Sequence, residues 1–205
     1  MIDLRHVDCM EYLATCEDNA FELAIVDPPY GLGKRTSDGG NKANTQVKFR
    51  QQMRDKKWDD NTPSKEYFQE IKRVCQNQIV WGGNYFELHS YRTFVVWDKM
   101  TPAPTMSQVE LAATSFDSPA RLVKINSNQS DRIHPTQKPV KLYEWLLMNY
   151  AKEGDRILDT HLGSGSIAIA CHNLGFDLVG CELDEDYYNA ACERLDKHKR
   201  QLRMF

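Results

Sequence analysis

The sequence predicts a single α/β domain with three α/β/α layers, in which a mostly parallel sheet is covered by helices on both faces. The chain has 205 residues, a length typical of one domain. Strand-like apolar runs alternate with helix-like segments along the whole chain, as in sheets built from parallel strands and crossover helices. Several of the strand-like runs end directly at glycine, proline or a carboxylate, where a turn begins.

In the N-terminal part we expect strands at 2–7, 22–26, 78–81, 93–97 and 109–115, and helices at 9–15 and 64–75. Pro28 and Pro29 stop the second strand, because proline has no backbone N–H to donate. Ser64 is a suitable N-cap for the helix that follows it. The polar stretch 32–62 is long for a loop inside a compact domain, and such loops are usually functional or disordered.

In the C-terminal part we expect helices at 140–150, 167–173 and 185–197, and strands at 156–159 and 178–181. The first of these helices carries apolar residues at helical spacing. Residues 116–133 are expected to be irregular, so the sequence predicts seven strands in all.

Composition and charge limit the class of protein. The net charge is −3, and no apolar run approaches the roughly 20 residues needed to cross a bilayer. The N-terminus lacks the layout of a signal peptide, so a cytoplasmic protein without a membrane partner is expected. None of the six cysteines has the spacing of a metal site, and we expect all of them to be reduced and no metal to be bound.

Positive charge gathers between residues 34 and 57, where eight basic residues face two acidic ones and give a local charge of +6. A solvated loop is one interpretation of this pattern, and contact with nucleic acid is the other. The candidate nucleic-acid-binding residues are Lys34, Arg35, Arg50, Arg54, Lys56 and Lys57.

A glycine turn follows the strand expected at 156–159. It contains Gly163 and Gly165 and leads into a helix, so backbone N–H groups can face a ligand. Glu182 ends the next strand, where a carboxylate can accept both hydroxyl hydrogens of a ribose. A purely structural tight turn, with Glu182 as an ordinary exposed acid, is the alternative.

A second motif, Asp27-Pro28-Pro29-Tyr30, ends the strand expected at 22–26. It offers an acceptor carboxylate, a rigid backbone with fixed carbonyl directions and an aromatic ring. These parts suit a flipped-out base, whose amine donates to Asp27 while Tyr30 stacks on its ring. Alternatively, the prolines end the strand and Tyr30 packs at the rim.

Together the two motifs resemble the DNA amino-methyltransferases, and in particular the permuted, beta-type group in which Asp-Pro-Pro-Tyr precedes the cofactor glycines. The resemblance extends to His134–Pro139, Val7–Cys9, Gly82–Phe86 and Trp97–Lys99. It implies a Rossmann-like methyltransferase domain over 1–205, with a seven-stranded sheet, a permuted motif order and S-adenosylmethionine as cofactor. It leaves only 116–132 for a target-recognition region, which is short for this group.

The resemblance also implies roles for single residues. The catalytic residues would be Asp27, Pro28, Pro29 and Tyr30. The cofactor-binding residues would be Asp8, Cys9, His134, Thr136, Lys138, Asp159, Gly163, Gly165, Ser166 and Glu182. Within this set Glu182 would bind the ribose, Asp8 would bind the adenine amine, and His134, Thr136 and Lys138 would surround the methionine end. His161 stands where the family often has phenylalanine, and its role is open.

The expected function is site-specific methylation of adenine N6 in double-stranded DNA, with the target base flipped out. A bacterial or phage-encoded enzyme, inside or outside a restriction-modification system, fits this pattern, and the sequence allows a homodimer. The alternatives are N4 methylation of cytosine, an RNA or protein amide substrate, and a non-catalytic subunit that binds the cofactor. A nicotinamide-dependent oxidoreductase is disfavoured, because the turn lacks the full Gly-x-Gly-x-x-Gly pattern.

Overall fold

The computed structural model describes residues 1–32, 59–88, 91–100, 107–129, 132–134 and 136–201. The six basic residues expected to contact nucleic acid, at positions 34 to 57, lie outside these ranges. Within them the strands are β1 (Ile2–His6), β2 (Phe21–Val26), β3 (Cys75–Trp81), β4 (Thr93–Asp98), β5 (Val109–Thr114), β6 (Arg121–Lys124), β7 (Arg156–Asp159) and β8 (Asp177–Glu182). The helices are α1 (Cys9–Ala14), α3 (Lys65–Val74), α4 (Val140–Tyr150), α5 (Ser166–Leu174) and α6 (Glu185–Arg200).

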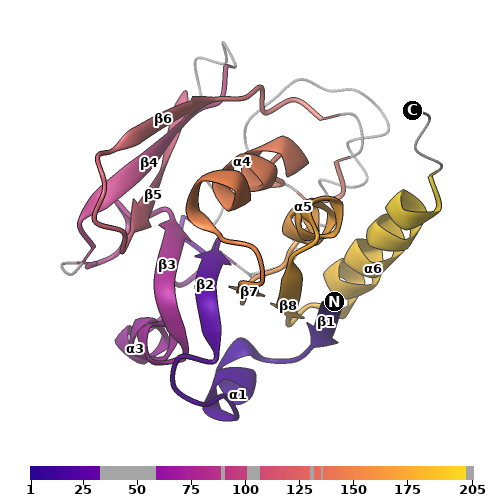
Figure 1. Ribbon diagram of the computed structural model, residues 1–205, viewed down its shortest axis with the longest axis horizontal. Coiled ribbons are helices and arrows are strands. Elements are labelled where there is room, and N and C mark those ends of the chain that lie inside the picture. Colours follow the sequence, from indigo (N-terminus) through magenta and orange to yellow (C-terminus); the bar gives the residue numbers. More distant parts are fainter. Residues whose placement is uncertain (33–58, 89–90, 101–106, 130–131, 135, 202–205) are drawn as a thin grey trace.

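All of the described strands belong to one sheet, in the order β1-β8-β7-β2-β3-β5-β4-β6. Neighbours from β1 to β3 pair in parallel, β5 is antiparallel to both β3 and β4, and β6 is parallel to β4. In Figure 1, β4, β5 and β6 lie at one end of the molecule, while β1 lies beside α6 at the other. The mostly parallel sheet predicted from the sequence is therefore confirmed.

The expectation of seven strands and of an irregular segment at 116–133 is wrong. Arg121–Lys124 forms an eighth strand, β6, which pairs with β4 over Val95–Asp98. Only Val123 of β6 is buried. A four-residue strand with one buried side chain has too little periodicity to be recognised, and its pairing with β4 is what makes it a strand.

Both faces of the sheet are covered, as the alternation within β2 shows. Leu23 and Ile25 belong to the core cluster that also contains buried apolar side chains from α4, α5 and α6. Ala24 and Val26 belong to a second cluster, shared with α1 and α3. Because consecutive side chains of a strand point to opposite faces, this division gives the three predicted layers.

Acidic and hydroxyl residues start three of the helices. The carboxylate of Asp8 accepts the N–H of Met10 and caps α1, and Ser64 caps α3 as predicted. Asp184 accepts two N–H groups at the start of α6. Each of these caps satisfies a backbone donor that the helix itself leaves unpaired.

The carboxyl ends of β2, β7 and β8 lie at one edge of the sheet, because these three strands are adjacent and parallel. Asp27 directly follows β2, and Asp159 and Glu182 are the last residues of β7 and β8. The two motifs therefore meet at this edge of the sheet, where ligands bind in open α/β sheets. Within the described parts of the chain, no helix has the length and apolarity to cross a membrane.

Candidate active site

A cavity of about 610 Å³ opens at this edge of the sheet. Its size falls within the range of ordinary small-molecule sites. Its wall includes nine residues expected from the sequence: Asp8, Cys9, Asp27, Pro29, His134, Thr136, Lys138, Gly163 and Glu182. Residues from both motifs thus share one cavity.

Glu182 ties the end of β8 to the glycine turn after β7. Its Oε2 accepts the N–H of Gly163 at 2.8 Å, and its Oε1 accepts the N–H of Asp184 at 3.0 Å. Gly163 has a φ of +51°, a conformation that favours glycine. Burial raises the pKa of Glu182, and these two backbone donors oppose that effect. The carboxylate is therefore held in one orientation at the cavity wall.

Asp8 and Cys9 lie next to this carboxylate at the start of α1 and line the same cavity. The side chain of Asp8 is fixed by the N–H of Met10 at 2.7 Å. Burial raises the pKa of the Cys9 thiol to about 12, so the thiol stays protonated near neutral pH. Cys9 is consequently a poor nucleophile and serves as part of the wall.

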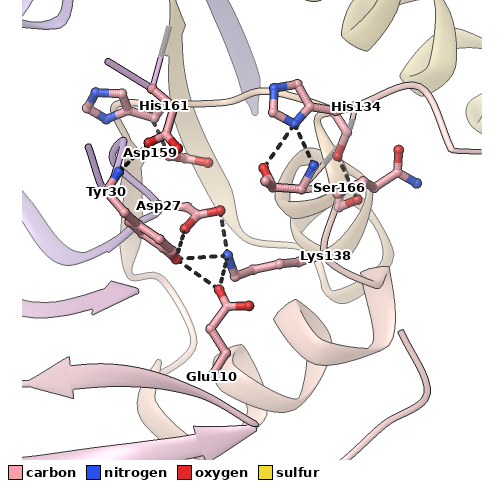
Figure 2. A network of polar contacts seen from close by, with 12 residues as sticks. Asp27, Tyr30, Glu110, His134, Lys138, Asp159, His161 and Ser166 are labelled. Atoms are coloured by element: carbon pink, nitrogen blue, oxygen red, sulfur yellow. Dashed lines mark hydrogen bonds and ion pairs between the residues drawn. The ribbon is translucent and has the colours of Figure 1, made fainter. Parts of the chain in front are cut away.

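His134 and Thr136 form another part of the wall. Nδ1 of His134 lies 3.3 Å from the N–H of Thr136 and 3.1 Å from its hydroxyl (Figure 2). The His134 ring also makes an edge contact with Tyr187, at a centroid distance of 4.4 Å. These contacts orient an imidazole that is almost completely buried.

Asp159, Gly165 and Ser166 are not among the described residues of the cavity wall, although they belong to the predicted cofactor turn. Asp159 is 1% exposed and accepts the N–H of His161 at 3.0 Å. The Ser166 hydroxyl accepts from Arg194 at 2.9 Å. These residues support the shape of the turn from behind. Burial raises the pKa of Asp159 to about 8.

Asp27 lies at the centre of a polar network that Figure 2 shows in close-up. Its Oδ2 is 2.5 Å from Nζ of Lys138, and its Oδ1 accepts the hydroxyl of Tyr30 at 2.6 Å. The same hydroxyl lies 2.8 Å from Oε1 of Glu110, which also pairs with Lys138 at 2.6 Å. Lys99 pairs with the other oxygen of Glu110 at 2.8 Å.

Lys138 was expected to surround the methionine end of a cofactor, but its ammonium group contacts both carboxylates of this network. It still lines the cavity and is 2% exposed. Although burial lowers the pKa of Lys138, Asp27 and Glu110 raise it above its usual value. Lys138 is therefore a charged, buried link between Asp27 and Glu110.

The ring of Tyr30 was expected to stack on a target base. In this structure it stacks on Tyr85, with a centroid distance of 5.0 Å and an interplanar angle of 16°. A Cβ atom on Gly82 would lie 2.3 Å from Cε1 of Tyr30, so the Gly82 backbone also approaches the ring closely. Tyr30 is not among the described wall residues, and neither is the buried Pro28.

Several wall residues were not expected from the sequence: Tyr67, Gln137, Tyr143, Thr160, Leu183, Asp184 and Tyr187 among them. Tyr67 contacts the ring of His161, and Thr160 bridges the two through its hydroxyl. Gln137 and Thr160 lie beside predicted site residues, within the His134–Pro139 segment and directly after Asp159, so the motifs could have indicated them. Tyr67, Tyr143 and Tyr187 come from helices, where the local sequence gives no sign of a site.

Glu110 and Lys99 were also missed, although the sequence contains a signal for them. Glu110 is a single charge in the apolar run of β5, and Lys99 directly follows β4. A charge inside a sheet core needs a partner, and this requirement identifies both residues as members of a buried pair.

Comparison with known proteins gives relatives along most of the chain. Type II methyltransferase M1.MboII of Moraxella bovis is 22% identical over 92% of this chain and 94% of that protein. Type II methyltransferase M2.DpnII of Streptococcus pneumoniae is 25% identical over 94% of this chain and 89% of that protein.

Solved structures have the same fold. M1.HpyAVI in complex with SAM superposes with a TM-score of 0.66 at 19% identity, covering 96% of this chain and all of that one. The cytosine-N4-specific PvuII DNA methyltransferase gives a TM-score of 0.65 at 12% identity, covering all of this chain and 88% of that one.

The sequence profile of the N6/N4 DNA methylase family matches residues 80–193, which is more than half of the chain. The match begins in β3 and ends in α6, so it includes the glycine turn, Lys138 and Glu182. This chain, with the network around Asp27 and the cavity beside it, therefore belongs to the DNA methylase family of N6/N4 methyltransferases.

Proposed function

We propose that this chain transfers a methyl group from S-adenosylmethionine to N6 of adenine in double-stranded DNA, at a specific site. One observation carries the proposal: Asp27, from the Asp-Pro-Pro-Tyr motif, faces the same cavity as Glu182 and Gly163. A carboxylate that can bind the target amine and a carboxylate suited to a ribose thus border one space.

The cavity wall fits the cofactor chemically. Asp8, Asp27, Glu182 and Asp184 surround the space with carboxylates, which suits a ligand carrying a sulfonium and an ammonium charge. Glu182 would accept from the ribose hydroxyls, and Asp8 from the adenine amine. His134, Thr136 and Lys138 would lie at the methionine end, with Gly163 letting the backbone come close. Asp159, Gly165 and Ser166 would act from behind, by holding the turn.

Asp27 would orient the target amine. The amine lone pair is delocalised into the base, and hydrogen bonds from the amine to Asp27 and to the Pro28 carbonyl favour a more tetrahedral nitrogen. Bound S-adenosylmethionine supplies an electrophilic methyl group. The nitrogen lone pair would accept this methyl group, leaving the cofactor as a neutral thioether, and Asp27 would accept the surplus amine proton. Alignment of this kind can contribute about 7–11 kcal/mol.

Tyr85 occupies one face of the Tyr30 ring in this structure, so a flipped base would stack on the opposite face or take the place of Tyr85. Pro28 and Pro29 would keep the backbone at the base pocket rigid. We assign the catalytic work to Asp27, with these three residues shaping the pocket around it.

DNA is the proposed partner, with the target base flipped out of the duplex. The positive segment 34–57 follows directly after Tyr30 and would contact phosphates beside that base, through Lys34, Arg35, Arg50, Arg54, Lys56 and Lys57. We further propose that the enzyme is cytoplasmic, comes from a bacterium or phage, and binds without a membrane or a metal. A homodimer remains a proposal for the assembly.

The choice of adenine is tested by supplying labelled S-adenosylmethionine with DNA duplexes of varied sequence, followed by nucleoside mass analysis. We expect label in N6-methyladenine, and an Asp27→Asn variant should lose it while still binding the cofactor. Label in N4-methylcytosine would replace adenine by cytosine as the target. Label in RNA alone, or none with any nucleic acid, would overturn the proposal.

A further inference from the structure

Two charged residues lie behind Asp27 without belonging to the described cavity wall. Glu110 is 15% exposed and Lys99 is 18% exposed, whereas Asp27 and Lys138 both line the cavity. Glu110 pairs with both lysines, one through each of its carboxylate oxygens. It therefore contacts the groups that hold Asp27 without belonging to the described cavity wall.

The hydroxyl of Tyr30 is within hydrogen-bond distance of two carboxylates, at 2.6 Å from Asp27 and 2.8 Å from Glu110. A phenol has a single proton to donate. A full hydrogen bond can thus go to only one of the two oxygens at a time. Because the two distances are nearly equal, a rotation about the C–O bond is enough to move the proton from one acceptor to the other.

Both oxygens of Asp27 are already engaged, since Oδ2 contacts Lys138 and Oδ1 contacts Tyr30. A target amine needs one of them as its acceptor. Lys138 is almost fully buried and forms an ion pair with Oδ2, so separating that pair would leave charges buried without a partner. Oδ1, with its neutral donor, is the oxygen that can be released at lower cost.

We propose that Glu110 is a positioning residue for Asp27. It accepts the Tyr30 hydroxyl when Oδ1 of Asp27 turns to the target amine, and it anchors Lys138 on Oδ2. This inference rests on the proposed function of Asp27. Glu110 itself contacts neither base nor cofactor.

The charges of the network support this arrangement. Two lysines and two carboxylates make it electrically neutral when all four are ionised. Burial raises the pKa of Asp27 despite the opposing effect of Lys138. Burial also acts to raise the pKa of Glu110, but Lys138 and Lys99 together lower it to about 2. Glu110 therefore stays ionised while Asp27 exchanges its partners.

The first test is the isosteric variant Glu110→Gln, with Glu153→Gln as a matched control in the exposed turn before β7. Single-turnover methyl transfer to DNA should fall on the order of 10²-fold in Glu110→Gln, the lower end of the range for general acid–base groups. Cofactor affinity, measured by calorimetry, should change less than about 3-fold, since no wall residue is altered. The control should match the wild type in both.

The pH profile separates positioning from structural damage. The described groups that act electrostatically on Asp27 or are acted on by it are Lys138, Glu110, Tyr30, Asp159, Asp59 and Tyr143. Asp27 must be ionised to accept the amine, and the charge of Glu110 raises its pKa. The acidic limb of the rate should therefore move to lower pH in Glu110→Gln. It should move to higher pH in Lys138→Met, because Lys138 lowers the same pKa.

A second variant covers the case in which Glu110→Gln does not fold. Glu110→Gln/Lys99→Gln removes one charge of each sign and keeps the network neutral, and its folding is checked by thermal unfolding. It should show the same loss of rate and the same shift of the acidic limb.

The outcomes distinguish the two proposals. A wild-type protein that methylates no DNA overturns the proposed function, and this inference with it. If the wild type methylates DNA and Asp27→Asn does not, but the folded Glu110 variants keep the wild-type rate and acidic limb, only the role of Glu110 is overturned. A loss of rate with an unmoved limb also overturns it, because a structural defect would act equally at all pH values.

Discussion

At the scale of the residue, the number of lysine partners separates two buried carboxyl groups, one with a raised pKa and one with a lowered pKa. Asp27 and Glu110 are 16% and 15% exposed, and burial acts to raise the pKa of both. Asp27 has Lys138 as its lysine partner, and its pKa stays raised. Glu110 has Lys138 and Lys99, and its pKa falls to about 2. Two similar carboxyl groups thus acquire different chemistry.

The Tyr30 hydroxyl is expected to matter beyond the ring. From the sequence alone, Tyr30→Phe should keep most of the function, because the ring is retained. In the structure the hydroxyl bonds to Asp27 and lies close to Glu110. We therefore expect Tyr30→Phe to slow single-turnover methyl transfer about 10-fold, from the loss of one hydrogen bond to a charged group. Tyr30→Ala should also lower the melting temperature, by removing the ring from Tyr85 and Gly82. Wild-type rates in Tyr30→Phe would contradict this role.

His161 should make stability depend on pH. Burial lowers its pKa to about 4 from an ordinary 6.5. The unfolded chain therefore binds a proton between these values and the folded chain does not, so the free energy of unfolding rises as pH increases from 4 to 6.5. In His161→Phe this rise in the free energy of unfolding with pH should be absent. The rise in the wild type is about 1–3 kcal/mol, because the ring remains partly exposed. Urea unfolding at several pH values measures it, and a difference between variant and wild type that does not vary with pH would exclude it.

At the scale of the element, the turn from β7 into α5 depends on close packing as well as on backbone conformation. Gly165, the N-cap of α5, has a φ of +68°, and a Cβ there would lie 3.0 Å from Cβ of Ala191 in α6. Gly154 also has a positive φ, of +89°, but nothing described lies within 4 Å of a Cβ at that position. Gly154 is therefore a suitable control for Gly165, because both have a positive φ and only Gly165 has a close neighbour.

We expect Gly165→Ala to destabilise the fold more than Gly154→Ala. Both variants carry the cost of a left-handed conformation, about 1 kcal/mol. Gly165→Ala adds overpacking against Ala191, typically about 1–3 kcal/mol. Thermal unfolding compares the two variants, and cofactor affinity should fall only in Gly165→Ala, because α5 starts at the cofactor turn. Equal melting temperatures would show that α6 moves away at no cost.

At the scale of the whole molecule, charge is unevenly distributed. The total is −3, but the segment 34–57 carries +6. The carboxylates at the cavity suit a cationic cofactor, while a positive segment after Tyr30 suits a polyanion. If the proposed function holds, this separation of charge along the chain would suit two ligands of opposite charge.

Neutralising the positive segment should change DNA binding and leave cofactor binding intact. Replacing Arg50, Arg54, Lys56 and Lys57 by glutamine should weaken DNA affinity. It should also flatten the slope of log affinity against log salt by up to about 0.9 for each lost phosphate contact. Lys152→Gln, before β7 at the opposite edge of the sheet, is the control. An unchanged slope would place the DNA elsewhere on the protein.

The fold class, the two motifs and the approximate positions of the described strands and helices, β6 excepted, follow from the sequence alone. The boundaries of α4 and β7 agree with the structure, because each is a strongly apolar segment with a clear stop. Strand ends followed by glycine, proline or a carboxylate predicted where the site lies, since parallel strands bring such ends to one edge.

Which side chains meet depends on contacts between distant parts of the chain, and these are visible in the three-dimensional structure alone. It made Arg121–Lys124 a strand through pairing with β4, and it brought Lys99, Glu110 and Lys138 from three elements to Asp27. Asp159 and Ser166, predicted to line the cofactor site, lie behind the described cavity wall in the structure. The physical reason is that local periodicity reports which face of an element is buried, whereas the partner of a buried charge depends on contacts between residues far apart in the chain.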